Sequence, residues 1–247
     1  MGGEAVIRIG CCGFQTSQKV YYQNFNLIEI QQTFYKVPML KTVLRWRKEA
    51  PKEFIFTLKA WQLITHEPYQ PTYKKHGLNL PESMWKNYGS FRPTQEVFTA
   101  WEKTLAIARG LEAPVVVFQC PAQFTPTPVH IENMRSFFRQ AKRDHLIFAW
   151  EHRGDWLANQ IRSLCSELNL IHCVDPFLRL PVTGDPAYFR MHGGADYSYQ
   201  FTEADFAQLQ YVCEEHQDAY CLFNNVEMWK DAHRFRDFLT AQGVSVS

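Results

Sequence analysis

The sequence lacks the long apolar runs that a membrane helix requires. No stretch approaches ~18 consecutive apolar residues, and no cationic segment followed by an apolar one opens the chain. We therefore expect no membrane span and no signal peptide. An excess of charge is also missing, because 26 Lys and Arg residues oppose 25 Asp and Glu residues. A net charge of +1 gives no indication of a polyanionic partner.

Cysteine pairs at metal-binding or redox spacing are absent as well. The seven cysteines form no CxxC motif, and an odd, dispersed set of thiols is typical of a reducing compartment. We therefore expect free thiols and a cytoplasmic protein. A thiol nucleophile near a strand end is an alternative, but buried cysteine is common in protein cores and a packing role is favoured.

Eight short runs rich in β-branched and aromatic residues recur along the chain, and none alternates with polar residues. Runs of this kind are typical of parallel strands that are buried on both faces. The eight predicted strands are Val6–Gly10, Leu27–Gln31, Phe54–Lys59, Val115–Gln119, Leu146–Glu151, Leu170–Asp175, Ala187–His192 and Ala219–Asn224.

Most segments between these strands have the apolar spacing of amphipathic helices. Thr94, Asp155 and Thr202 stand where helix N-caps are expected, and Leu40–Glu49 is predicted to be a short helix. The connections 10–27 and 176–186 show little helical pattern. We expect full outer helices to be missing there.

Strands that alternate with helices predict a parallel sheet with right-handed crossovers. Eight such strands predict an α/β fold, a closed eight-stranded parallel (β/α)8 barrel with some outer helices missing or short. An open doubly wound sheet is the alternative, but no glycine-rich phosphate loop follows the first strand. A length of 247 residues without an evident linker predicts one domain over residues 1–247.

Polar side chains gather where the predicted strands end. Residues two apart in a strand share a face, so Glu151 and Arg153 are expected to point into the same space. The carboxyl ends of the strands form the active face of barrel enzymes. A structural ion pair or a solvated loop residue is the alternative at any single position. The strand-end residues are Glu29, Lys59, Gln119, Glu151, Arg153, Asp175, Arg190, His192 and Asn224.

An unpaired buried charge is costly, so these carboxylates and cations are expected to lie close together. Guanidinium and ammonium groups bind oxyanions, whereas carboxylates and imidazole transfer protons. The residues assigned to catalysis are Glu29, Glu151, Asp175 and His192. The residues assigned to substrate or anion binding are Lys59, Arg153, Arg190, Gly193, Gly194, Gln119, Asn224, His66 and Tyr35.

Two cofactor questions remain open in the sequence. Gly193-Gly194 allow the backbone to approach a phosphate closely, although paired glycines also simply make turns. The assigned carboxylates and His192 could instead coordinate a divalent metal, but the nearby Lys and Arg residues compete for those carboxylates. We therefore predict no cofactor and keep a metal as the lesser alternative.

The longest segment without a helical pattern is 61–93, which is rich in aromatic and basic residues. It could form a lid over the carboxyl-end rim, since it follows the third strand directly. Aromatic rings interleaved with Lys and Arg also suit single-stranded nucleic acid. A cover packed against the edge of the barrel is the third alternative.

Several motifs follow one another in order along nearly the whole chain. They are Cys12-Gly13-Phe14, Glu29-Ile30-Gln31-Gln32-Thr33-Phe34-Tyr35, Phe54–Ala60, Ile64-Thr65-His66, Phe118-Gln119-Cys120-Pro121, Trp150-Glu151-His152-Arg153, Asp175, Phe189–Gly193 and Phe223-Asn224-Asn225. Together they resemble the YecE-like family, also called domain of unknown function 72. The resemblance implies a barrel related to the triosephosphate isomerase fold and places the family's motif residues at the strand ends given above. It implies no reaction.

We predict an enzyme that acts on a small anionic, phosphorylated or carboxylated, polar substrate by acid/base chemistry. Hydrolysis, isomerisation and lyase chemistry are all open. The alternatives are a module that binds or processes single-stranded nucleic acid and a small-molecule binding protein without turnover. Neither the substrate nor the oligomeric state follows from the sequence.

Overall fold

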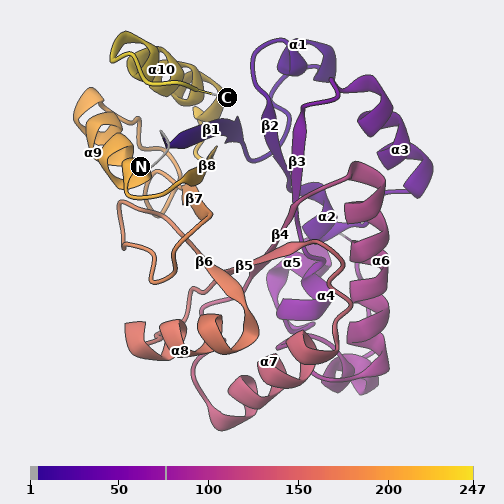
Figure 1. Ribbon diagram of the computed structural model, residues 1–247. Coiled ribbons are helices and arrows are strands. Elements are labelled where there is room, and N and C mark those ends of the chain that lie inside the picture. Colours follow the sequence, from indigo (N-terminus) through magenta and orange to yellow (C-terminus); the bar gives the residue numbers. More distant parts are fainter. Residues whose placement is uncertain (1–4, 76, 247) are drawn as a thin grey trace. The chain divides into compact units, whose positions relative to one another are not determined.

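The computed structural model describes residues 5–75 and 77–246, and its eight strands form a closed barrel in the order β1 to β8 (Figure 1). The pairings whose registers are defined, such as β1 with β8 and β4 with β5, are all parallel. The predicted fold class is therefore confirmed. No described helix is long and apolar enough to cross a membrane. The expectation about the start of the chain falls partly on residues 1–4, which lie outside the described residues.

All eight predicted strands are present, and no strand end differs from the prediction by more than one residue. Asp175, His192 and Asn224 were predicted inside strands but lie one residue beyond them. The strands are β1 Val6–Cys11, β2 Leu27–Ile30, β3 Ile55–Lys59, β4 Val115–Gln119, β5 Ile147–Glu151, β6 Leu170–Val174, β7 Ala187–Met191 and β8 Asp218–Phe223.

Helix N-caps were predicted correctly at two of three positions. The hydroxyl of Thr94 accepts a hydrogen bond from the Val97 N–H, and Thr202 forms a capping box with Asp205. Asp155 was wrong, because the helix begins later, at Ala158. The described helices are α1 Gln18–Tyr22, α2 Gln32–Tyr35, α3 Leu40–Glu49, α4 Gln62–Thr65, α5 Pro71–Lys75, η1 Glu82–Asn87, α6 Gln95–Leu111, α7 Pro128–Gln140, α8 Ala158–Leu168, α9 Glu203–Glu214 and α10 Met228–Ala241.

The contacts at the start of α8 explain why Asp155 is not its N-cap. The Gln160 side chain accepts a hydrogen bond of 3.1 Å from the backbone N–H of Leu157, the N-cap residue. A glutamine inside the first turn therefore satisfies a backbone donor at the helix start.

Both connections predicted to lack a full helix do lack one. Only the five-residue α1 joins β1 to β2, and no helix is described between β6 and β7. In the connection between β1 and β2, the fully buried Tyr21 packs where a longer outer helix is missing. Its hydroxyl accepts from the Cys11 N–H at 2.8 Å and donates to the Leu27 carbonyl at 2.9 Å, so one side chain satisfies two strands.

The segment 61–93 was expected to contain no helix, and this expectation was wrong. It contains α4, α5 and the 3₁₀ helix η1, and both α4 and η1 pack against α6. Each is too short for the apolar periodicity that marks a helix in a sequence. Buried side chains, among them Ile64, Tyr73 and Phe91, hold the segment together. Its role as a lid stays a prediction.

The chain forms two compact units, each with its own core. The first unit comprises residues 1–30, 50–56 and 171–247, and the second comprises residues 31–49 and 57–170. In the first unit α10 packs on β1, β8 and α9 (Figure 1). In the second unit α6 packs on α3 and α4. Each unit carries polar side chains at the carboxyl ends of its strands.

The cysteines are free and buried, as predicted. Cys213 and Cys221 come closest to pairing, with their sulfur atoms 3.4 Å apart and unbonded. Burial raises the pKa of the Cys11 thiol to about 12 and also raises the pKa of Cys120. These two thiols stay protonated at neutral pH, which agrees with a packing role.

Candidate active site

In the first unit, Glu29, Tyr188 and Arg190 form a fully buried group, which we call the buried triad. One oxygen of the Glu29 carboxylate lies 3.1 Å from Arg190 Nη2, and the other accepts a 2.9 Å hydrogen bond from the Tyr188 hydroxyl. Tyr188 and Arg190 are two residues apart in β7 and so share a face of the strand. Both carboxylate oxygens are thus engaged inside the protein.

His192, two residues after Arg190, is in direct contact with Asp175, which follows β6. One oxygen of Asp175 accepts a 2.9 Å hydrogen bond from the His192 backbone N–H and lies 3.3 Å from His192 Nδ1. The other oxygen accepts from the Phe177 N–H at 3.1 Å. The carboxylate therefore fixes the orientation of the imidazole, which is the arrangement that general-base histidines use.

The two glycines after His192 make a tight turn. Gly193 and Gly194 have φ angles of +69° and +85°. A Cβ on Gly193 would lie 2.8 Å from the Asn225 Cβ, so the position requires glycine sterically as well. The Tyr199 N–H closes the turn by donating to the Gly193 carbonyl at 3.0 Å. A phosphate-binding role for these glycines stays a prediction.

The asparagine chosen from the sequence is not the one that turns inward. The side chain of Asn224 is half-buried, whereas Asn225 is buried and donates from Nδ2 to Asp231 at 2.8 Å and to the Tyr199 carbonyl at 3.1 Å. Both belong to one motif, and strand alternation cannot separate them because β8 ends at Phe223. Asn225 thereby ties the turn after β7 to α10.

The second unit has a cluster of contacting side chains near the end of β3, formed by Lys59, Phe34, His66 and Gln119. The Lys59 ammonium, at the end of β3, donates to the Gln119 side-chain oxygen at 2.7 Å and lies 4.1 Å from the centre of the Phe34 ring. The His66 ring meets the same Phe34 ring edge-on at 4.8 Å. The ring of half-buried Tyr35 lies 5.0 Å from Phe34.

Glu151 and Arg153 are paired, as their spacing predicts. Nη2 and Nε of Arg153 lie 3.0 and 3.2 Å from the same Glu151 oxygen. The Glu151 side chain is 6% exposed, but that of Arg153 is 34% exposed. Solutes can therefore reach the guanidinium although its partner is buried.

His66 interacts electrostatically with Lys59 and with the pair formed by Glu151 and Arg153. Burial lowers the pKa of His66 to about 3, the Lys59 and Arg153 cations lower it further, and Glu151 opposes them. The imidazole is therefore uncharged at neutral pH. We call Lys59, His66, Gln119, Glu151 and Arg153 the cation cluster.

Three contributing residues were missed in the sequence. Tyr188 could have been found, because it lies two positions before Arg190 and alternation puts both on one face. Phe34 and Thr65 belong to the family motifs given above, but neither was assigned a role at the site. An apolar ring beneath a lysine and a threonine bonded to its neighbouring histidine look like ordinary core residues in a sequence.

A metal site was the lesser alternative. Among residues 5–75 and 77–246, no group of three or more His, Cys, Asp or Glu side chains is placed to hold a metal ion. Glu29 and Glu151 are instead bound to arginines, which is the competition expected from the sequence.

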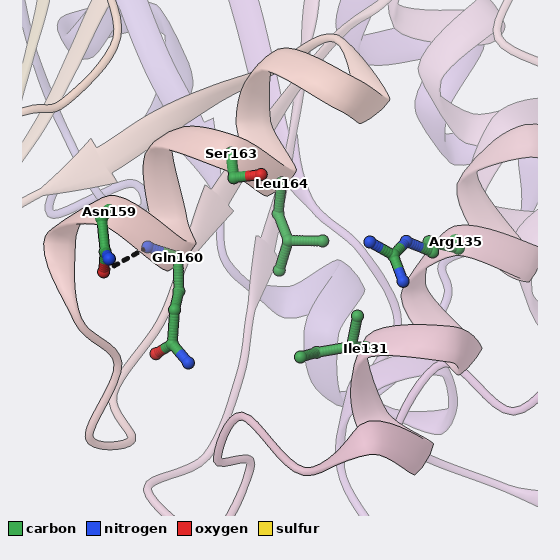
Figure 2. Close-up of a pocket in the computed structure, with 6 residues that line it drawn as sticks. All are labelled: Ile131, Arg135, Asn159, Gln160, Ser163 and Leu164. Atoms are coloured by element: carbon green, nitrogen blue, oxygen red, sulfur yellow. Dashed lines mark hydrogen bonds between the residues drawn. The ribbon is translucent and has the colours of Figure 1, made fainter.

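A separate cavity of about 230 Å³ lies between α7 and α8. Figure 2 shows Ile131 and Arg135 reaching it from α7, and Asn159, Gln160, Ser163 and Leu164 from α8. Arg135 is engaged through Nε by both oxygens of Glu167 at 3.0 Å. This pair provides a matched comparison for Arg153 and Glu151.

Comparisons with known proteins agree with the fold. A family model described as "Protein of unknown function DUF72" matches residues 9–246. A DUF72 family protein from Enterococcus faecalis V583 is 19% identical, with a TM-score of 0.73 over 99% of this chain and 100% of that one. A DUF72 family protein from Thermotoga maritima MSB8 is 17% identical, with a TM-score of 0.69 over 95% of this chain and 99% of that one.

Barrels outside the family are similar in fold alone. A D-psicose 3-epimerase is 10% identical, with a TM-score of 0.55 over 91% of each chain. No curated protein matches the sequence.

Proposed function

The chain belongs to the DUF72 family, and from this premise we propose that it is an enzyme acting on a small anionic polar substrate by acid/base chemistry. The fold is compatible with this, since the carboxyl ends of barrel strands carry the active sites of barrel enzymes. We also expect it to work in the cytoplasm, where its cysteines remain reduced.

One observation carries the proposal. In the cation cluster, the positive charges of Lys59 and Arg153 both lower the pKa of the buried His66, which is uncharged at neutral pH. Together with Glu151, these groups sum to one positive charge. Two cations that both act on one buried imidazole favour binding of an anion, and Arg153 is exposed enough to meet one.

The roles follow from chemistry and burial. Arg153, with its planar fork of donors, binds a carboxylate or phosphate in a bidentate manner, and Lys59 adds charge. Glu151 accepts a proton. In the first unit, His192 is oriented by Asp175 and forms a separate candidate proton-transfer group. The buried triad holds its own strands, since its carboxylate is engaged by protein groups on both oxygens.

A titration with small anions tests the proposal. Phosphate, sulfate and glycolate are added to the full chain at constant ionic strength, and binding is followed by ¹H–¹⁵N NMR shifts. Replacing Arg153 by Lys keeps the charge but loses the fork, so we expect affinity to fall at least tenfold. Arg135→Lys, which alters the paired arginine beside Glu167, is the matched control.

The Arg135→Lys control shows whether a loss of anion affinity is specific to the change at Arg153. Arg135→Lys should bind the anions as the unmodified protein does. The proposal is overturned if the unmodified protein binds none of the anions, or if both variants lose affinity equally.

The two alternative functions, binding of single-stranded nucleic acid and binding of a small molecule without turnover, are tested with the same protein samples. Single-stranded nucleic acid binding would appear as oligonucleotide affinity that falls steeply with salt. In the segment 61–93, the rings of Tyr73 and Phe91 are buried in packing, whereas Tyr69 is 51% exposed and Trp61, Trp85 and Tyr88 are half-buried. A binding protein without turnover would hold the anion and convert no substrate.

A further inference from the structure

The hydroxyl of Thr65 determines which nitrogen of His66 carries the proton. Thr65 is fully buried, and its Oγ1 lies 2.9 Å from His66 Nδ1. Within residues 5–75 and 77–246, Nδ1 is the one side-chain partner of this hydroxyl. A buried O–H left without an acceptor is costly, so the hydroxyl donates to Nδ1. The proton of the neutral imidazole then sits on Nε2.

The Nε2–H group is available to a ligand. In the part of the chain that the structure describes, no hydrogen bond is made by Nε2. The ring is 5% exposed and is held edge-on against Phe34. A donor that is fixed in direction, without a protein acceptor, loses little freedom when it meets a substrate oxygen.

The surroundings of His66 favour negative charge on that oxygen. Lys59 is the last residue of β3, and Arg153 lies two residues beyond the end of β5. Both cations are close enough to lower the pKa of the imidazole. Burial, together with the same two cations, lowers the pKa of His66 and keeps the ring neutral, so it acts as a neutral N–H donor. Glu151 is the carboxylate of the same group.

We propose that His66 is the uncharged hydrogen-bond donor that stabilises an enolate oxygen, and that the substrate is a small α-hydroxycarbonyl compound carrying a carboxylate or phosphate. This rests on the proposed function and narrows it to proton abstraction next to a carbonyl group. An enolate oxygen is where charge develops in such a reaction, and a fixed donor aimed at that point lowers the barrier.

The step balances without an oxidant. The proton on the carbon next to the carbonyl passes to the Glu151 carboxylate, and the C–H electron pair forms a carbon–carbon double bond. The carbonyl π electrons move to the oxygen, which accepts a hydrogen bond from His66 Nε2–H. Returning the proton to the same carbon regenerates the substrate. The isomer forms when the hydroxyl proton of the enediolate passes to the neighbouring enolate oxygen and Glu151 returns its proton to the former carbonyl carbon.

The protonation state of His66 is tested first, without any substrate. The imidazole ¹⁵N shifts of the full chain, labelled at histidine, are followed from pH 8 to pH 4.5. We expect His66 to remain neutral throughout, with the proton on Nε2. In Thr65→Val, which removes the hydroxyl, we expect a mixture of the two tautomers. Protonation above pH 5, or a proton on Nδ1 in the unmodified protein, contradicts the inference.

Exchange of carbon-bound hydrogen tests the chemistry. Glyceraldehyde 3-phosphate, dihydroxyacetone phosphate and hydroxypyruvate are each incubated with the protein in D₂O, and loss of the α-C–H signal is followed by ¹H NMR. We expect exchange with at least one probe. His66→Phe should slow it at least a hundredfold, and His66→Gln, which restores an N–H donor, should recover part of the rate.

The matched control is His130→Phe, at a histidine of the same unit that stacks on Phe124 with ring centres 4.5 Å apart. It should leave exchange unchanged. If the unmodified protein binds the anions but exchanges no probe, this inference is wrong and the proposed function stands. If it binds none of them, the proposed function itself is wrong.

Discussion

The two units each contain an arginine bound to a glutamate at the strand ends, and the two pairs differ in burial. Arg190 and Glu29 in the first unit have side chains that are 0% exposed. Arg153 and Glu151 in the second unit have side chains that are 34% and 6% exposed. The nitrogen–oxygen distances are nearly equal, at 3.1 and 3.0 Å.

Burial, rather than contact distance, separates their roles. A buried pair costs desolvation, and loss of either partner leaves a charge in an apolar setting. A partly exposed arginine keeps access to solvent and can share its donors with a ligand. We therefore assign the first pair to holding the fold and the second to binding.

Replacing Arg190 by Met gives the largest expected effect. The change leaves the Glu29 carboxylate buried without its guanidinium, which costs about 3–5 kcal/mol of unfolding free energy. Arg153→Met is the comparison in the other unit; its guanidinium is partly exposed but Glu151 is buried, so we expect a smaller loss of about 1–2 kcal/mol. Urea unfolding followed by circular dichroism measures both. Equal losses would remove the distinction between the pairs.

Gly193→Ala tests how tightly the first unit is built around its strand ends. The new Cβ would meet the Asn225 Cβ at 2.8 Å and sit at a φ of +69°, so we expect a loss of about 2–4 kcal/mol. Gly243→Ala has a similar φ of +76° but meets no atom within 4 Å, and should cost about 1–2 kcal/mol. If both variants lose the same stability, the close approach contributes nothing.

The pH dependence of stability tests the second unit. The pKa of His66 is about 3 in the folded protein, against an ordinary value of 6.5. The unfolded chain therefore binds the proton more readily, and stability falls as pH drops through 6.5 towards 3. Between pH 7 and pH 5 this group should remove about 2 kcal/mol.

A variant isolates this contribution. His66→Phe cannot titrate at this position, so its stability should fall less over the same pH range. Chemical unfolding at several pH values makes the comparison. Parallel pH curves for the two proteins would show that His66 titrates normally.

The smallest expected effect is that of Arg153→Lys on stability. The ammonium still faces Glu151 from a partly exposed position, so the unfolding free energy should change by less than about 1 kcal/mol, although anion affinity falls. Thermal unfolding and the anion titration are read on the same sample. If the variant unfolds while anion affinity in the folded fraction is unchanged, the pair is structural.

The barrel was predictable because its signals are local. Buried strands, helix caps at Thr94 and Thr202, and the gap between β6 and β7 all have short-range sequence patterns. The helices α4, α5 and η1 were missed because each is at most six residues long, and such helices depend on tertiary packing rather than on periodicity.

The candidate site was predictable in membership more than in arrangement. Strand ends pointed to Glu151 and Arg153, and alternation put both on one face. Burial could not be predicted, so Arg190 was assigned to anion binding on the same grounds as Arg153. The role of Thr65 depends on a single 2.9 Å hydrogen bond to its neighbour, which no spacing rule encodes.

A crystal of the protein soaked in sulfate tests the central claim, that the cation cluster binds a small anion. We expect an ordered sulfate within hydrogen-bond distance of the Arg153 guanidinium and of His66 Nε2, and its loss in crystals of Arg153→Lys. A sulfate ordered only elsewhere, such as beside Arg135 between α7 and α8, with the cation cluster empty, would contradict it.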